Sequence, residues 1–263
     1  MAAERGACDR LYCLCLGCQD IARSVLIEEG GPEVVRCPTT AVLAHSPEGW
    51  FLLDTGLSRE VSQLPELAEL WFPWGLPGYP GDGDPLLDVL SICGVEPAEI
   101  AGVGISHLHA DHAGGLKHFE NGPTVFIHQA ELDYAFGAAG ATDGYYRPEY
   151  GLPGIRWHAV EGDAQIAPGI TALATPGHTP GHLAYRVETT DSGAWLFAFD
   201  AILTRVNVEL DRTGGRTSPA GHQAALRASQ ERLVVLAETE SARLIPGHCP
   251  DTWSTLRLPP EHY

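Results

Sequence analysis

The chain has 263 residues and carries 16 Lys and Arg against 34 Asp and Glu, which gives a formal net charge of −18. Hydrophobic residues make up 44 % of the sequence and charged residues 19 %, which is typical of a folded globular protein and excludes a disordered chain. An acidic surface repels phosphate backbones and anionic lipid headgroups, so we expect no nucleic acid and no membrane among the partners. The 12 histidines are many for this length and need an explanation.

The N-terminal segment gives no sign of targeting. Residues Met1–Asp9 lack a basic start followed by an apolar run, which is the pattern of a signal peptide. The longest apolar runs, such as Ala194–Phe199, are far too short to span a bilayer. We therefore expect a cytoplasmic protein.

Four of the seven cysteines crowd the first part of the chain, at Cys8, Cys13, Cys15 and Cys18. One interpretation is a small zinc or redox site that uses the Cys15-x-x-Cys18 pair. The other is a strand over Leu11–Leu16 in which the cysteines serve as small apolar side chains. No second pair follows at zinc-ribbon spacing, which favours the strand.

A hairpin and a long loop come next. Thr39–His45 and Trp50–Asp54 are β-rich runs, and the segment Ser46–Gly49 between them has good turn chemistry. Gly56–Gly83 is rich in proline and glycine and is predicted to be a loop. Its aromatic side chains either pack beneath the loop or form the wall of an apolar substrate pocket; the candidates are Trp71, Phe72, Trp74 and Tyr79.

The remaining elements alternate between helices and strands. Asp84-Pro85 opens a helix that Gly94 ends, and a buried strand follows at Ile100–Ser106. Ser218-Pro219 is expected to be the N-cap and first residue of a helix that ends near Ser241. Other predicted elements are strands at Thr124–His128, Trp157–Glu161, Ile170–Thr175, Leu183–Thr189, Trp195–Asp200 and Arg243–Pro246, a helix at Gln129–Ala138 and a loop at Gly140–Gly154. This mixture predicts an α/β or α+β single domain.

The segment Ser106–Gly115 carries the strongest chemical signal. It holds His107, His109, Asp111 and His112 within six residues, directly after a buried strand. Imidazole nitrogen and carboxylate oxygen suit borderline divalent metals, above all zinc. His107 and His109 share one face in extended backbone, whereas Asp111 and His112 follow where the chain turns, so one segment can serve two adjacent metals.

Three later positions add further candidates of the same kind. His178 and His182 lie in the segment Thr175–His182, and His248 leaves an apolar strand. Asp200 ends another apolar strand, where a carboxylate is costly unless a charged group meets it. A divalent cation is the natural partner for such a carboxylate.

The order of these residues resembles the ligand pattern of the metallo-β-lactamase superfamily of metal-dependent hydrolases. The resemblance extends from about Leu11 to the C-terminus. It implies a four-layer αβ/βα sandwich, with residues 11–263 as one hydrolase domain and residues 1–10 as an N-terminal tail. It also implies two Zn²⁺ ions at one edge of two packed sheets, with manganese, iron or cobalt as alternatives.

The resemblance also implies how the ligands divide. His107, His109 and His178 would hold one metal, and Asp111, His112 and His248 the other, with Asp200 bridging the two. Asp54, in Leu53-Asp54-Thr55-Gly56, matches the aspartate that supports a ligand histidine in the family. His182 is interpreted as a structural or supporting residue next to the ligands.

Within the superfamily the chain is most similar to the N-acyl-homoserine lactonases. The segments Ser106–Gly115, Glu161–Asp163 and Thr175–His182 carry this likeness. Members of that group place a substrate-binding tyrosine three residues after the bridging aspartate, where this chain has Leu203. Tyr145, Tyr146 and Tyr150 are candidate replacements, and the small Ala110 leaves room near the metals for a longer acyl chain.

The implied reaction is hydrolysis of a lactone by quorum-quenching chemistry. A hydroxide bridging two cations about 3.5–4 Å apart would attack the lactone carbonyl, and Asp111 would relay a proton to the leaving alkoxide. The alternatives are another ester or thioester hydrolase of the glyoxalase-II type and, less favoured, a non-catalytic metal-binding protein. The expected partner is a small lactone or ester, and the protein is expected to be a monomer or homodimer.

Overall fold

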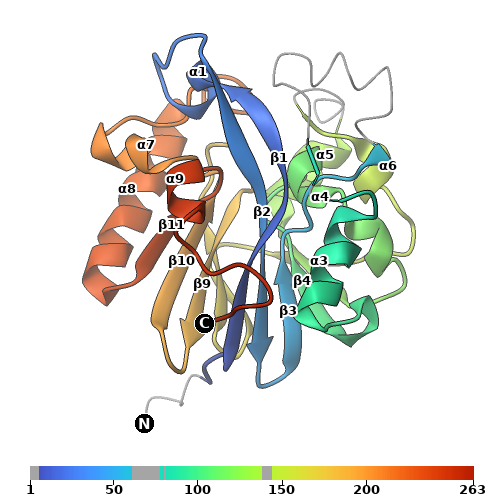
Figure 1. Ribbon diagram of the computed structural model, residues 1–263. Helices are drawn as coiled ribbons and strands as arrows, with labels where there is room; N and C mark the ends of the chain where they lie inside the picture. Colours follow the sequence, from blue (N-terminus) through green and yellow to red (C-terminus); the bar gives the residue numbers. More distant parts are fainter. Residues whose placement is uncertain (1–5, 61–77, 80, 138–143) are drawn as a thin grey trace.

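The computed structural model describes residues 6–60, 78–79, 81–137 and 144–263, and its two β-sheets pack face to face with helices on both outer sides (Figure 1). The first sheet contains, in spatial order, β1 (Arg10–Ala22), β2 (Val34–Ser46), β3 (Gly49–Leu53), β4 (Ile100–Gly104), β5 (Thr124–His128) and β6 (Arg156–Val160). Strands β1 to β3 are antiparallel, and β3 to β6 run parallel to one another.

The second sheet has five strands. Its spatial order is β11 (Arg243–Pro246), β10 (Gly193–Phe199), β9 (Leu183–Thr189), β8 (Ile170–Ala174) and β7 (Ala164–Ala167). Strand β11 is parallel to β10, and β9 is antiparallel to both β10 and β8. Strands β8, β10 and β11 therefore run in one direction, and their carboxyl ends lie at the same edge of the sheet.

The helices lie on the two outer faces. On the side of the first sheet are α3 (Pro85–Cys93), α4 (Ala110–Ala113), α5 (Gln129–Phe136) and α6 (Arg147–Tyr150), with the 3₁₀ turns Pro97–Glu99 and Leu116–Phe119. The long helix α8 (Gln223–Glu240) covers the second sheet. The described residues also include the short helices α1 (Arg23–Leu26), α7 (Arg205–Glu209) and α9 (Pro250–Trp253).

Side-chain alternation along the strands produces three apolar layers. On β1, Tyr12 and Leu14 pack toward α3, whereas Leu11 and Cys13 pack toward the second sheet. On the far side of the second sheet, Leu196 packs with Leu233 of α8. The order helix, sheet, sheet, helix is the predicted four-layer αβ/βα sandwich, and that prediction is confirmed.

The N-terminal cysteines belong to strand β1 and its approach. All seven cysteines are free, and none belongs to a metal-binding group among the residues that the structure describes. Burial raises the pKa of both Cys8 and Cys13 to about 12, which keeps the thiols protonated. The backbone N–H of Cys8 donates a hydrogen bond to the carbonyl oxygen of Glu188 in β9. The chain therefore contacts the second sheet before residue 11, where the domain was expected to start. The interpretation as an apolar strand residue agrees with the placement of Cys13, whereas Cys18 Sγ accepts a hydrogen bond from Arg36 Nε at 3.1 Å and serves as a polar group.

Several predicted elements are confirmed, and two need correction. The hairpin of β2 and β3, the Asp84-capped helix α3 and the strand β11 form as expected. The long helix begins at Gln223 and not at Pro219, because Gly221 has a φ of 93°, which a right-handed helix cannot include. The expected loop Gly140–Gly154 contains one helical turn, α6. Strand β7 and the helices α1, α7 and α9 were not predicted.

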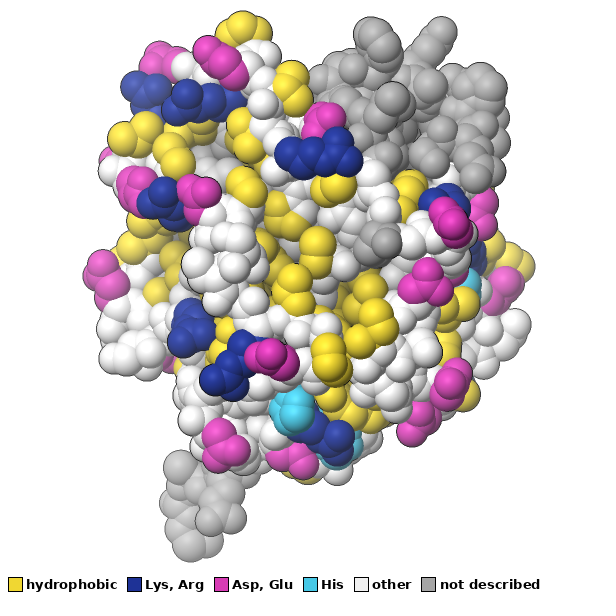
Figure 2. Space-filling view, viewed as in Figure 1, with side chains coloured by type: hydrophobic (Ala, Val, Ile, Leu, Met, Phe, Trp, Pro, Cys, Tyr) yellow, Lys and Arg dark blue, Asp and Glu magenta, His cyan; other side chains and the backbone are white. Residues whose placement is uncertain are grey.

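The charged surface is mixed on the face shown in Figure 2. Arginine and lysine side chains lie beside acidic ones on this face. Arg205, for example, pairs with Glu209 and Asp251. Among the described residues, no helix combines the length and the apolar character that crossing a bilayer requires.

Candidate metal centre

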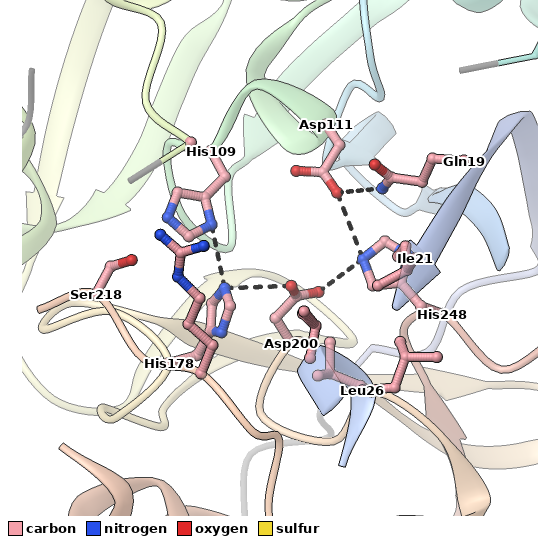
Figure 3. Close-up of a pocket in the computed structure, with 13 residues that line it drawn as sticks. Gln19, Ile21, Leu26, His109, Asp111, His178, Asp200, Ser218 and His248 are labelled. Atoms are coloured by element: carbon pink, nitrogen blue, oxygen red, sulfur yellow. Dashed lines mark hydrogen bonds and ion pairs between the residues drawn. The ribbon is translucent and has the colours of Figure 1, made fainter. Parts of the chain in front are cut away.

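The predicted ligand residues converge at one edge of the two sheets. Each follows directly on a strand or sits on the turn after it: His107 and His109 after β4, Asp111 and His112 on α4, His178 after β8, Asp200 after β10 and His248 after β11. The parallel direction of β8, β10 and β11 brings the last three together (Figure 3). Asp111 and His248, although distant in sequence, therefore lie with Oδ2 and Nε2 3.5 Å apart.

His107, His109 and His178 form the first set of donor atoms. The Nδ1 atom of His109 lies 3.0 Å from Nε2 of His107 and 3.1 Å from Nε2 of His178. Three nitrogens around a tetrahedral zinc ion lie about 3.3 Å apart. The set thus has nearly the spacing that one cation requires.

Asp111, His112 and His248 form the second set. The Oδ2 atom of Asp111 lies 3.6 Å from Nε2 of His112 and 3.5 Å from Nε2 of His248. This set combines two imidazole nitrogens with one carboxylate oxygen, a mixture that borderline divalent metals accept.

Asp200 lies between the two sets. Its Oδ2 atom is 3.2 Å from Nε2 of His178, and its Oδ1 atom is 3.1 Å from Nε2 of His248 and 3.3 Å from Nε2 of His112. One carboxylate therefore presents one oxygen to each set (Figure 3).

The buried atoms at this site fit a divalent metal. His112 Nε2 and Asp200 Oδ1 are buried without a hydrogen-bond partner among the described residues, which is costly unless a cation meets them. Burial, together with the neighbouring histidines, holds the pKa values of His107 and His109 well below the ordinary range, so these rings are neutral and can bind a metal. The His and Asp clusters are consistent with a dinuclear metal site.

Hydrogen bonds from behind fix the orientation of the rings. Asp54 Oδ2 lies 2.7 Å from Nδ1 of His112, and its Oδ1 accepts the backbone N–H of Ser106 at 2.6 Å. His248 donates Nδ1–H to Pro38 O at 2.8 Å. His182 Nε2 accepts the backbone N–H of Asp200 at 3.1 Å. Asp54 thus contacts the predicted ligand His112, and His182 contacts the predicted ligand Asp200. Neither residue belongs to a donor set, and both lie where the sequence suggested.

Two polar residues near the centre escaped the sequence analysis. Gln19, on β1, donates Nε2–H to Asp111 Oδ2 at 2.6 Å. Glu131, on α5, is fully buried below the His107–His109 segment. Gln19 lies within a strand near its end and Glu131 sits in a helix, so nothing local distinguishes either from a surface residue.

A pocket opens directly onto the donor atoms. Its polar side includes His109, Asp111, His178, Asp200 and His248. The apolar side chains that line it are Ile21, Val25, Leu26 and Leu203, and the other polar lining residues are Gln19, Arg216 and Ser218. The apolar wall comes from the end of β1, from α1 and from the segment after β10.

Only some of the predicted pocket residues line the pocket. Leu203 lines the pocket, but Tyr79, Ala110, Tyr145 and Tyr146 are not among the described residues that line it. The hydroxyl of Tyr145 donates to Glu131 at 2.7 Å, that of Tyr79 to Ser58 O at 2.7 Å and that of Tyr150 to Ala135 O at 3.0 Å. Trp71, Phe72 and Trp74 lie outside the described residues.

Comparisons with known proteins agree with this geometry. The profile of the metallo-beta-lactamase superfamily matches residues 34–248. The N-acyl homoserine lactonase AttM of Azorhizobium caulinodans is 28 % identical over 97 % of this chain and 98 % of its own length. An N-acyl homoserine lactonase of Bacillus cereus is 35 % identical over 67 % of this chain and 68 % of its own length.

A solved structure extends the comparison to the whole fold. AiiA of Bacillus thuringiensis, with N-decanoyl-L-homoserine bound at its active site, superposes with a TM-score of 0.86 at 26 % identity, covering 98 % of this chain and all of that one. The two packed sheets, the clustered His and Asp donors and the profile match together show that this chain belongs to the metallo-beta-lactamase superfamily.

Proposed function

We propose that this protein is a lactonase that opens the ring of N-acyl homoserine lactones or a closely related lactone, using two zinc ions. His107, His109 and His178 would hold one ion, and Asp111, His112 and His248 the other. Asp200 would serve both, because its two oxygens face different donor sets. Manganese, iron and cobalt remain alternatives, since the same nitrogen and oxygen donors accept them.

The bound cations supply a water of lowered pKa as nucleophile and polarise the ester carbonyl. Among the protein's own groups, Asp111 is placed to handle the proton of the leaving hydroxyl. Its Oδ2 is held by Gln19, and the residue lines the pocket, so Oδ1 is the atom that would take the proton of the attacking water and pass it to the leaving alkoxide. His112 is kept in one orientation by Asp54 throughout.

The pocket wall is the observation that carries the substrate proposal. Ile21, Leu26 and Leu203 are nearly fully buried and line the same cavity as the metal donors. An acyl chain lying against them removes apolar surface from water, at about 0.8 kcal/mol per methylene. Arg216 and Ser218 line the same cavity and offer hydrogen-bond donors for the carbonyl groups of an acyl-homoserine lactone.

Leu203 also favours a second candidate, a related ester or thioester hydrolase of the glyoxalase-II type. A leucine here cannot donate the hydrogen bond that a tyrosine would give to a lactone. A purely metal-binding, non-catalytic role is less favoured, because all seven donor residues are present and a pocket reaches them.

A substrate panel separates these candidates. Metal-loaded protein is given butanoyl- and decanoyl-homoserine lactone, γ-butyrolactone, S-lactoylglutathione and a phosphodiester, and proton release is followed. We expect rapid release with the acyl-homoserine lactones. Release with the thioester or phosphodiester alone contradicts the proposal, and so does an active sample with fewer than two metals per chain.

A further inference from the structure

Glu131 is a buried carboxylate outside both donor sets. It lies on α5, has no solvent exposure and is surrounded by the segments that carry the predicted ligands. Burying a carboxylate costs several kcal/mol unless hydrogen bonds replace the lost water. The hydrogen-bond donors that surround Glu131 therefore indicate the role of its side chain.

Three donors converge on this carboxylate. Its Oε1 atom accepts the backbone N–H of Leu108 at 3.0 Å and the hydroxyl of Tyr145 at 2.7 Å. Its Oε2 atom accepts the backbone N–H of Gly181 at 3.2 Å. Since the two oxygens bind different segments, the carboxylate joins parts of the chain that are otherwise separate.

Each donor is close in sequence or space to one set of ligands. Leu108 separates His107 from His109, and Gly181 lies three residues after His178. The ring of Tyr145 packs edge-on against His109, with the ring centroids 4.7 Å apart. The three contacts together reach every residue of the first donor set.

The packing around Gly181 shows how closely the segments approach. A Cβ atom at this position would lie 2.2 Å from the backbone nitrogen of Glu131, so only glycine permits the contact. The loop that carries His178 is thus pressed against the start of α5, where Glu131 can receive its N–H.

We propose that Glu131 is a positioning residue for the metal subsite of His107, His109 and His178, because its carboxylate clamps the backbones that carry these ligands. Asp54 has the comparable task behind His112. The inference rests on the ligand assignment made under the proposed function, and not on the choice of substrate.

The test measures zinc affinity in two single-site backgrounds. His248→Ala removes a ligand of the second subsite and His178→Ala one of the first, so each variant retains mainly one cation. Glu131→Gln keeps the size of the side chain but turns an amide NH₂ toward one of the donors. Zinc dissociation constants come from competition with a chromophoric chelator, and circular dichroism checks folding.

We expect Glu131→Gln to weaken zinc binding about 10–100-fold in the His248→Ala background and less than about twofold in the His178→Ala background. Equal effects in both backgrounds, or none in either, overturn the proposal. Glu149→Gln is the matched control, since Glu149 is also a buried acidic side chain but accepts its hydrogen bond from Ser58. It should leave both affinities unchanged.

A second variant covers the case in which Glu131→Gln does not fold. Tyr145→Phe removes one donor to Glu131, and we expect a several-fold loss of affinity in the His248→Ala background only; unchanged affinity there overturns the proposal. A parent protein that binds fewer than two zinc ions overturns the ligand assignment and this inference with it. A parent that binds two ions but opens no lactone overturns the substrate proposal alone.

Discussion

The amide of Gln19 donates a hydrogen bond of 2.6 Å to Oδ2 of Asp111, across 92 residues of sequence. Gln19 reaches this position because β1 continues past a bulge between Cys15 and Gly17 and ends at the pocket. The contact is buried, so it holds the Asp111 carboxylate in one orientation without competition from water. A strand of the first sheet thereby takes part in ordering the candidate metal centre.

Replacing this amide should disturb the second donor set. Gln19→Leu keeps the bulk but removes the donor, and we expect kcat/KM for acyl-homoserine lactone hydrolysis to fall about 10–100-fold. Zinc titration of the variant should show one weakened site. Gln165→Leu, at an exposed position on β7, serves as the control. Wild-type rates and affinities in Gln19→Leu would show that Asp111 needs no support from β1.

Removing the shared carboxylate should have the largest effect. Asp200→Ala deletes the group whose oxygens face His178 and His248, so we expect hydrolysis to fall by at least about 100-fold and zinc content to drop below two per chain. Asp251→Ala removes an exposed carboxylate that pairs with Arg205 and should change neither quantity. An active Asp200→Ala enzyme would contradict the proposed ligand assignment.

Filling the apolar wall should change chain-length preference. Ile21→Phe adds volume beside the metal donors, and a decanoyl chain that loses contact with two methylenes loses about 1.5 kcal/mol, or roughly tenfold in KM. Butanoyl-homoserine lactone should be hardly affected. The comparison of kcat/KM for both substrates checks this. Val34→Phe, on an exposed part of β2, is the control, and an equal loss for both substrates would place the acyl chain elsewhere.

Glu149 should make stability depend on pH. Burial raises the pKa of Glu149 to about 8, opposed in part by its hydrogen bond from Ser58. Between about pH 4.5 and pH 8 the folded state holds a proton that the unfolded state has released, so the free energy of unfolding falls as pH rises through this range. Above pH 8 Glu149 is ionised in both states, so its contribution to the free energy of unfolding no longer changes with pH.

The variant Glu149→Gln removes this dependence. Thermal unfolding of both proteins with metal bound should show equal stability near pH 4.5 and an advantage for Glu149→Gln on the order of 5 kcal/mol at pH 8.5. Effects of pH on metal binding are common to both proteins and cancel in the difference. For Glu48→Gln, in an exposed turn, the difference in stability from the wild type should stay constant across this pH range. A flat difference for Glu149→Gln as well would contradict the assigned pKa.

Much of the site was predictable because its signals are local. His107, His109, Asp111 and His112 occupy one short segment, and no surface or core role accounts for that density of ligating atoms. His178, Asp200 and His248 each lie at or shortly after the end of an apolar strand, and the resemblance to a known family then divided the seven residues between two metals. Turn chemistry was equally informative for the hairpin and for the Asp84 cap, whereas the start of α8 was misplaced because Gly221, with a φ of 93°, interrupts the helix that Ser218-Pro219 was expected to open.

The tertiary structure alone decided what surrounds the ligands. Gln19, Glu131 and the wall of Ile21 and Leu26 come from β1, α1 and α5, and no periodicity in those segments reveals that they meet the metal centre. The hydroxyl of Tyr145 donates its hydrogen bond to Glu131, so Tyr145 is not placed to donate one to a substrate. The sequence by itself determined which atoms are suited to bind metal, because that is a property of residue type and short-range spacing. Which groups orient those atoms, and which apolar side chains face them, depends on the packing of two sheets and so could be read only from the fold.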